Sequence, residues 1–175
     1  MSDFEDEYTT ETGDAEVDVT RAVLDARIAV LASAEPICLP ATATVREAIQ
    51  RMLARRQAGV LIVDGDGRLA GIFTERDVLT RVVGPGRDPA RTPLADVMTP
   101  NPEALTAAHR VAYAIHCMSV AGYRTVPLVD DAGRPIGIVT VGDVVRWLAD
   151  LFPEAILNLA PGGDTLKHPG EIDAG

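Results

Sequence analysis

Two short motifs of one pattern, a threonine followed three residues later by an aspartate, carry the clearest chemistry in this sequence. They are TERD at 74–77 and TVGD at 140–143, and each lies where a predicted strand passes into a predicted helix. The first turn of a helix offers free N–H groups and the positive end of the helix dipole, so a threonine hydroxyl there can help to bind an anion. An ionised aspartate only accepts hydrogen bonds, and it suits the two hydroxyls of a ribose cis-diol.

The same motif has a purely structural interpretation. A threonine at the N-cap with an acidic residue three positions later resembles a capping box, in which the two side chains satisfy the free amide groups of the first turn. The sequence leaves both interpretations open. The motif occurs twice, each time after a hydrophobic strand that ends in Gly-Ile-Phe or Gly-Ile-Val. This duplication argues against a chance occurrence of the motif.

An internal repeat organises the chain. A shift of 66 residues aligns 36–83 with 102–149 without a gap, and 17 of the 48 pairs are identical. Such self-similarity predicts two copies of one fold. We expect residues 36–83 to form the first repeat, 84–101 a linker with a short helix near Leu94–Met98, and 102–150 the second repeat.

Each copy has the order strand, helix, strand, strand, helix. The first strands are predicted at 37–39 and 103–105, and the hairpins begin at 60–63 and 126–129, which are rich in Val and Ile. The helices are indicated by apolar residues at helical spacing. In the first copy these residues are Val45, Ala48, Ile49, Met52 and Leu53, then Val78, Leu79 and Val82; in the second they are Val111, Ala114, Ile115 and Met118, then Val144, Val145 and Leu148.

The ends of the chain differ in composition from the repeats. Residues 1–15 form an acidic tail that is predicted to be disordered, and 16–35 are predicted to hold a helix, over 17–32, and a linker. Residues 151–175 are predicted to be an extended tail with a docked patch at Ile156–Leu159. The formal charge is -10, and eight of the 26 acidic residues lie in the first twenty positions, so the repeats themselves are nearly neutral.

This charge distribution argues against several partners and compartments. There is no cluster of Lys and Arg to neutralise a nucleic-acid backbone or an anionic membrane surface, and we expect neither partner. The amino terminus is acidic where a secretory signal is basic and then apolar, and the apolar runs are far shorter than the roughly 18 residues needed to cross a bilayer. A cytoplasmic protein is expected.

Catalytic and metal sites have little support in the sequence. Cys38 and Cys117 are far apart on apolar segments, which favours buried reduced thiols. His109 and His116 have no third ligand at a suitable spacing, and Gly65–Gly67 imitates a dinucleotide loop but lies within a predicted hairpin turn. No Ser/His/Asp or Cys/His arrangement can be assembled, so we expect no metal, no catalytic residues and no enzyme activity.

The two strings VLIVDGDGRLAGIFTERDVL and GYRTVPLVDDAGRPIGIVTVGDVV resemble a tandem pair of cystathionine-beta-synthase (CBS) domains. The resemblance covers residues 36–149. It implies an α/β (α+β) fold of two pseudo-twofold-related repeats, each a small three-stranded sheet with two helices. It also implies two clefts for adenosine-containing ligands and assembly into flat, disc-shaped dimers.

The resemblance implies that each cleft combines the Thr-x-x-Asp motif of one repeat with the first strand and the G-h-x-x-h-P segment of the other. Only the second repeat has that whole segment, at 122–127. The first cleft is therefore expected to be the better nucleotide-binding site, with Arg124 and Arg76 as phosphate-binding cations. The first cleft is expected to contain Thr74, Arg76, Asp77, Asn101 to Leu105, Tyr123, Arg124 and Val126. The second is expected to contain Thr140, Asp143, Pro36, Ile37, Leu39, Gln57, Ala58 and Val60.

These features predict a stand-alone regulatory module that binds AMP, ADP, ATP or a related adenosyl ligand, needs no cofactor, and signals in trans to an unidentified partner protein. A homodimer is expected from the apolar residues Val144, Val145, Trp147 and Leu148 of the last helix. The first alternative is a structural dimerisation module without a physiological ligand, in which both motifs are only caps. An enzyme that acts on the nucleotide is a third hypothesis without a general base or metal set behind it.

Overall fold

The computed structural model describes residues 21, 23–31 and 34–151. The chain divides into two compact units, residues 1–144 and 145–175, and only 145–151 of the second unit are described. The predicted acidic tail at 1–15 and the predicted tail beyond Leu151, with its docked patch, therefore lie outside the described residues. So does part of the helix predicted over 17–32, of which positions 23–25 are helical.

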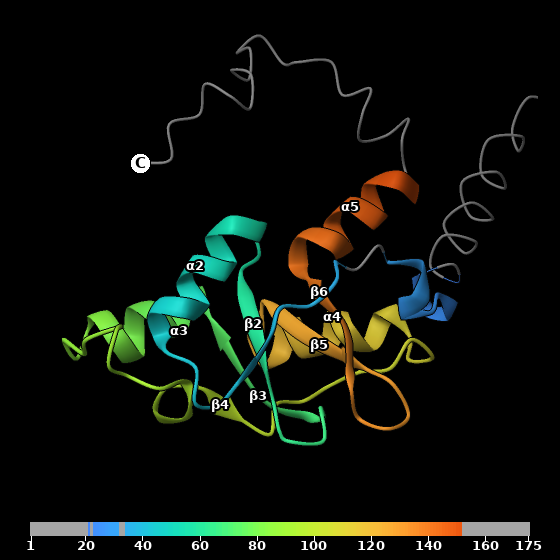
Figure 1. Ribbon diagram of the computed structural model, residues 1–175. Helices are drawn as coiled ribbons and strands as arrows, with labels where there is room; N and C mark the ends of the chain where they lie inside the picture. Colours follow the sequence, from blue (N-terminus) through green and yellow to red (C-terminus); the bar gives the residue numbers. More distant parts are fainter. Residues whose placement is uncertain (1–20, 22, 32–33, 152–175) are drawn as a thin grey trace, which may run out of the picture. The chain divides into compact units, whose positions relative to one another are not determined.

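The expected order of elements is found in the first repeat, whereas the second lacks its expected first strand at 103–105, where Leu105 forms only an isolated bridge to Leu128 (Figure 1). The first contains β1 (Cys38–Pro40), α2 (Val45–Arg55), β2 (Gly59–Val63), β3 (Leu69–Thr74) and α3 (Glu75–Asp77), which continues into the π-helical turn η2 (Val78–Val83). The second contains α4 (Val111–Val120), β5 (Thr125–Val129), β6 (Pro135–Thr140) and α5 (Val141–Leu151). Two short 3-10 helices, η1 (Ile28–Val30) and η3 (Leu94–Asp96), precede the repeats, and β4 (Thr99–Pro100) follows η3.

Local sequence signals explain where these elements begin and end. Helix α2 begins after Thr44, whose hydroxyl accepts a hydrogen bond from the Glu47 amide at 3.2 Å, and it ends at Arg56 in the left-handed conformation. In the turn between β2 and β3, the Asp64 carboxylate accepts from the amides of Asp66 and Arg68 at 2.9 Å. Asp130 makes the equivalent bonds in the second hairpin, so the glycine-rich strings there form turns, as expected.

The mixed α/β class is confirmed, but the strand count differs from the expected three per sheet. The first sheet has four strands in the order β1-β2-β3-β4, because Thr99 and Pro100 from the predicted linker pair antiparallel with β3. In the second sheet β5 pairs with β6, and isolated bridges join Leu105 to Leu128 and Ala34 to Ile138. Each sheet therefore receives an edge from the segment that precedes the other repeat.

Backbone hydrogen bonds repeat this exchange with the shift of 66 residues. The Ile28 amide donates to His109 O at 2.9 Å, and the Leu94 amide donates to Ala43 O at 2.9 Å. The Val111 amide donates to Ala26 O at 2.8 Å, while the Val45 amide donates to Thr92 O at 3.0 Å. The pseudo-twofold relation between the repeats therefore extends into the segments before them. Each segment forms backbone hydrogen bonds with the residues at the start of the first helix of the other repeat.

Buried apolar side chains from both repeats and from the linker pack between the elements in clusters. The first repeat contributes a cluster that includes Val60 and Phe73, and the linker adds Leu94 and Val97 to it. Residues Leu61 and Ile72 form a second buried cluster with Ile138 of β6, so the two sheets share apolar contacts. This packing fixes the end of β3 and the segment before β5 relative to one another, and the candidate site lies there.

Candidate functional site

A cavity of about 520 Å³ lies between the two repeats, where β3 passes into α3 and where α4 passes into β5. A volume of this size is within the range of small-molecule sites, roughly 300 to 1,000 Å³. Its lining comes from both repeats and from the segment that joins them. The lining residues are Ala58, Ile72, Thr74, Glu75, Arg76, Asp77, Leu79, Arg81, Thr99, Pro102, Glu103, Ala121, Gly122, Tyr123, Arg124, Thr125 and Pro127.

The Thr-x-x-Asp motif of the first repeat is a closed capping box in one wall of this cavity. Asp77 Oδ2 accepts from the Thr74 amide at 2.8 Å and from the Thr74 hydroxyl at 2.8 Å. The Asp77 side chain is 11% exposed, and its other oxygen, Oδ1, lies 3.2 Å from Arg81 Nε. The aspartate is thus held by the helix start and by an arginine one turn later, and it keeps a small accessible surface.

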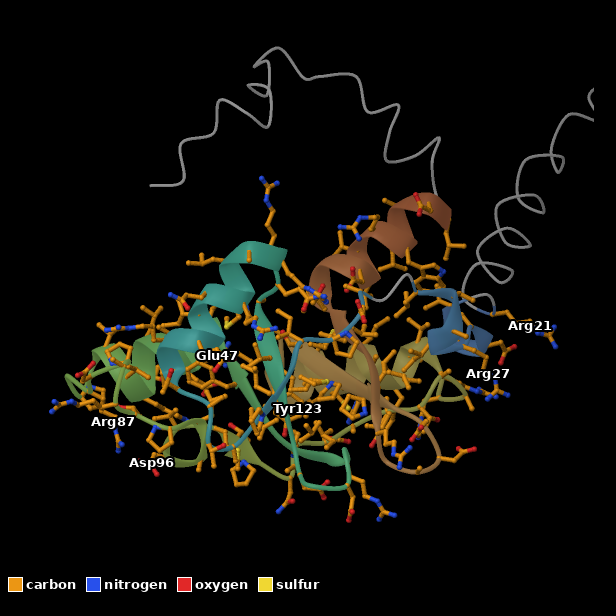
Figure 2. All side chains as sticks on the ribbon, viewed as in Figure 1. Arg21, Arg27, Glu47, Arg87, Asp96 and Tyr123 are labelled. Atoms are coloured by element: carbon orange, nitrogen blue, oxygen red, sulfur yellow. The ribbon has the colours of Figure 1, made fainter. Side chains whose placement is uncertain are left out.

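The opposite wall is formed by the loop between α4 and β5, which contains Gly122, Tyr123 and Arg124. Gly122 has a φ of 70°, a conformation that glycine adopts without strain, and its carbonyl accepts from Arg76 Nη1 at 3.5 Å. Tyr123 is 43% exposed and is labelled in Figure 2. An exposed aromatic ring beside arginines can stack on a planar base while the cations bind an anion.

Three arginines and three carboxylates line the cavity. Asp77 is already bonded to Thr74 and Arg81, and Glu103 Oε1 accepts from the Tyr113 hydroxyl at 2.8 Å and lies 3.6 Å from Cys117 Sγ. The hydrogen bond to Glu103 and its charge raise the pKa of Tyr113. Arg76 and Arg124 make no ion pair among the described residues, so their guanidinium groups can each bind an anionic group of a ligand.

Several predicted residues meet at this cavity. Seven of the eleven residues expected in the first cleft line it: Thr74, Arg76, Asp77, Pro102, Glu103, Tyr123 and Arg124.

The other four residues expected there, Asn101, Ala104, Leu105 and Val126, do not line the cavity. Leu105 and Val126 are each 1% exposed, because they face the core from adjacent positions of the second sheet. Asn101 lies after β4 with a φ of 46°, and its amide donates to Ala70 O at 3.0 Å. Their neighbours Pro102, Glu103, Thr125 and Pro127 line the cavity.

The residues expected in the second cleft are mostly placed elsewhere. Ile37, Leu39 and Val60 are buried in the core of the first repeat, since their strand positions face inward, and Pro36 before them is half-buried. Ala58 lines the first cavity, because its carbonyl accepts from the Glu75 amide at 3.1 Å and holds it beside the TERD motif.

The second Thr-x-x-Asp motif is also a capping box. The Thr140 amide and hydroxyl donate to Asp143 Oδ2 at 2.8 and 2.7 Å, and the Asp143 amide donates back to the Thr140 hydroxyl at 3.3 Å. Neither residue lines the first cavity. The two copies therefore share local geometry and differ in what surrounds them.

Sequence reasoning missed part of the lining, above all Arg81 and Glu75. Arg81 is four residues after Asp77 on a helical segment, a spacing that brings the two side chains together, and this signal could have found it.

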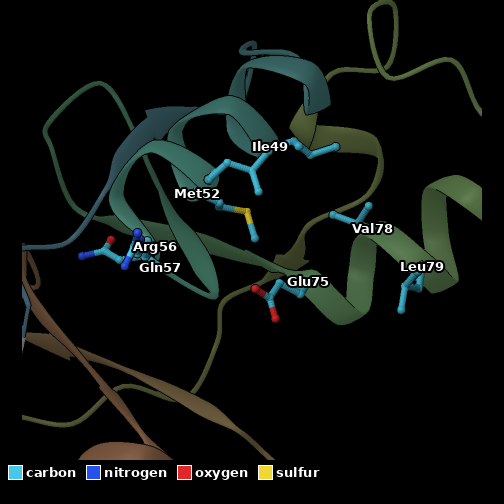
Figure 3. A pocket seen from close by; sticks show the side chains of 8 residues that line it. Ile49, Met52, Arg56, Gln57, Glu75, Val78 and Leu79 are labelled. Carbon is cyan, nitrogen blue, oxygen red and sulfur yellow. The ribbon is translucent and has the colours of Figure 1, made fainter. Parts of the chain in front are cut away.

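A separate apolar groove lies between α2 and the α3–η2 segment (Figure 3). Figure 3 shows Ile49 and Met52 of α2 on one side, with Val78 and Leu79 on the other. Gln57, expected in the second cleft, lies at one end of this groove. Leu53, which also lines it, is 74% exposed, and Leu79 is 65% exposed. Exposed leucines in one groove are typical of a surface that meets another protein.

Two further expectations concern cysteines and metals. Cys117 is buried, as expected, but Cys38 is exposed, because Leu39 takes the inward position of β1 and leaves its neighbours outside. Burial and then the Glu35 charge raise the pKa of the Cys38 thiol. Within the described part of the chain, no group of three or more metal-ligating side chains is found, and no helix there is long and apolar enough to span a membrane.

Comparisons with known proteins agree with this architecture. The family model described as CBS domain matches residues 28–84 and 94–150, two segments that are again 66 residues apart. The mitochondrial CBS domain-containing protein CBSX3 of Arabidopsis thaliana is 36% identical over 121 residues, which cover 66% of this chain and 58% of that protein. Across the curated relatives, this chain spans between 15% and 58% of their length.

Similar solved structures share this fold, and two of them are complexes with adenosine-containing ligands. A CBS domain protein from Pyrobaculum aerophilum complexed with AMP has a TM-score of 0.65 and 26% identity, covering 74% of this chain and 98% of that one. The CBS domain pair of protein MJ0100, in complex with 5′-methylthioadenosine and S-adenosyl-L-methionine, has a TM-score of 0.64 and 26% identity, covering 71% and 97%. The chain belongs to the CBS domain family and carries two copies of the domain in tandem.

Proposed function

We propose that this CBS pair is a regulatory module that binds an adenosine nucleotide in the cavity between its repeats. One observation carries the proposal. A single cavity is lined by the Thr-x-x-Asp motif of the first repeat and by the Gly122–Pro127 segment of the second. Two similar structures bind AMP or adenosyl ligands, which supports an adenosine-containing ligand here.

The chemistry of the lining suits such a ligand. Tyr123 offers an aromatic face to the base, Asp77 and Thr74 offer acceptors to the ribose, and Arg76 and Arg124 offer cations to a phosphate. No ion pair of Arg124 is present among the described residues, so its charge is available to a ligand. AMP, ADP and ATP are the proposed ligands, and no catalytic residue is proposed.

Calorimetric titration with AMP, ADP, ATP, adenosine, 5′-methylthioadenosine and S-adenosyl-L-methionine tests the proposal. We expect saturable binding of at least one phosphorylated nucleotide, competed by the others. If none of the six compounds binds at millimolar concentration, the alternative of a structural dimerisation module is favoured. Product analysis after long incubation would detect an enzyme that acts on the nucleotide.

The module is further proposed to act as a homodimer and to signal in trans to a partner protein. The apolar groove with Leu53 and Leu79 supports a protein contact on the first repeat. Val144, one of the apolar residues from which a homodimer is expected, is buried in this structure and adds nothing to the exposed surface. The expectation of a cytoplasmic protein stays a prediction, and one relative carries a mitochondrial name.

A further inference from the structure

Arg81 lies one helical turn after Asp77 and touches the same carboxylate that faces the cavity. Its Nε is 3.2 Å from Asp77 Oδ1, and its Nη1 donates to Val97 O at 2.9 Å. Both side chains line the cavity. Arg81 therefore occupies the accessible side of the residue proposed to bind ribose.

The acceptor sites of Asp77 are mostly filled. A carboxylate oxygen has about two lone-pair sites, and Oδ2 already accepts from the amide and the hydroxyl of Thr74. Oδ1 accepts from Arg81 and has one site left. A ribose diol that places both hydroxyls on Asp77 must take the position of Arg81 Nε.

Displacing Arg81 from Asp77 costs little free energy. The Arg81 side chain is 41% exposed, and water screens ion pairs of this kind so that they add little stability. The second bond of Arg81, to the Val97 carbonyl, is a single neutral acceptor. The long, flexible arginine side chain can move within the same cavity wall.

A displaced guanidinium lies among the other cations of the lining, Arg76 and Arg124, which repel it. Of the remaining lining carboxylates, Glu103 already accepts from Tyr113, and Glu75 is exposed to water, which weakens its attraction. A phosphate on the ligand supplies two acceptor oxygens in the geometry that arginine prefers. Adenosine supplies no anion. Trp147 stands at the equivalent position of the second repeat, so this arrangement belongs to the first repeat alone.

We propose that Arg81 determines the selectivity of the cavity for phosphorylated nucleosides: it leaves Asp77 when the ribose binds and pairs with the ligand's phosphate. The inference rests on the proposed nucleotide function and adds a residue and a ligand class to it. The free protein keeps Arg81 on Asp77, and only a ligand that carries both a diol and a phosphate satisfies both residues.

The test is calorimetry with AMP and with adenosine on the parent, Arg81→Gln, Arg81→Lys and Arg87→Gln. In Arg81→Gln we expect AMP affinity to fall at least about tenfold, while adenosine affinity stays within about threefold or improves. Arg81→Lys should keep most of the preference for AMP because it keeps the charge. Arg87 is the matched control, since it is exposed, does not line the cavity and lies well apart from Tyr123 (Figure 2).

The ratio of the two affinities decides the result, and circular dichroism confirms that each variant is folded. Equal losses of AMP and adenosine in Arg81→Gln would mean that Arg81 only positions Asp77, and an unchanged ratio would remove Arg81 from recognition. Either result overturns the inference. If the parent protein binds no AMP at all, the proposed function itself fails, and this is seen before any variant is compared.

Discussion

Asp77 Oδ2 lies 2.8 Å from both the amide nitrogen and the hydroxyl oxygen of Thr74. The same pair of residues thus closes the first turn of a helix and forms part of a cavity wall. The structural and the ligand-binding interpretations of the motif are therefore compatible. A substitution of Asp77 removes a cap as well as a proposed ligand contact, so the two effects must be separated by design.

Asp77→Ala is predicted to weaken AMP binding at least about tenfold. It removes one or two charge-assisted hydrogen bonds of roughly 1.5 to 3 kcal/mol each, and about 1.4 kcal/mol corresponds to tenfold in affinity. Asp143→Ala is the matched control, because Asp143 makes the same capping box with Thr140 but does not line the cavity. Its AMP affinity should stay within about threefold of the parent.

Both variants should lose stability through the lost cap, by about 0.5 to 2 kcal/mol, and urea unfolding measures this loss. The ligand effect is the difference between the two titrations. If Asp143→Ala loses AMP binding and Asp77→Ala retains it, the better cleft has been assigned to the wrong repeat. If both folded variants bind like the parent, the motif is only a cap.

Arg124→Ala is predicted to weaken AMP and ATP about tenfold or more and to leave adenosine nearly unchanged. Arg124 lines the cavity from the second repeat and is proposed to contact phosphate, not base. Raising the salt concentration should reduce AMP affinity in the parent more than in the variant, because the variant has lost a charge contact. Equal weakening of adenosine and AMP would contradict this role.

The fold was predictable because its strongest signal is a repeat with a constant spacing. The helical stripe at Val45, Ala48 and Met52 and the Asp-x-x-Gly turns are local patterns, and the structure places both as expected. The fourth strand at Thr99–Pro100 was not predictable. A two-residue strand has no periodicity, and it forms because the linker crosses to the sheet of the other repeat.

The site was predictable where it follows motifs and not where it follows packing. Thr74, Asp77 and Arg124 were assigned from sequence, and all line one cavity. Val60 and Leu105 were assigned to clefts and are core residues, because β2 is buried on both faces around Val60 and Leu105 is buried where it bridges to Leu128. Arg81 was missed, although its spacing of four residues from Asp77 on a helical segment brings the two side chains together.

Thr44→Ala is predicted to lower the free energy of unfolding by about 1 kcal/mol, within a range of about 0.5 to 2 kcal/mol. The Thr44 hydroxyl accepts from the Glu47 amide at 3.2 Å, and alanine leaves that amide without its partner. Urea unfolding measures the loss. Thr42→Ala is the control, since Thr42 is exposed in the turn before the helix and should change stability by less than about 0.5 kcal/mol. Similar values for the two variants would show that the cap contributes little.

Leu53→Glu is predicted to dissociate the proposed homodimer and leave the monomer folded. Leu53 is 74% exposed in the apolar groove, so a charge there costs the monomer little but would be buried without a partner in an interface. Sedimentation at micromolar concentration measures the change. Ile136→Glu, at an exposed position of β6 outside the groove, should leave the assembly unchanged. A dimer that survives Leu53→Glu would place the interface on another surface.

Cys38 is predicted to react with iodoacetamide more slowly than an ordinary exposed cysteine near pH 8. Burial of the thiol and then the Glu35 charge raise its pKa, so a smaller fraction is present as the reactive thiolate at this pH. In a Cys117→Ser background, which leaves Cys38 as the single thiol, Glu35→Gln removes the charge, lowers the pKa and should speed the reaction. Asp66→Asn, in the exposed hairpin turn, is the control for a general change of charge. The pH dependence of the alkylation rate separates the two variants, and an unchanged profile in Glu35→Gln would show that burial alone sets the pKa of Cys38.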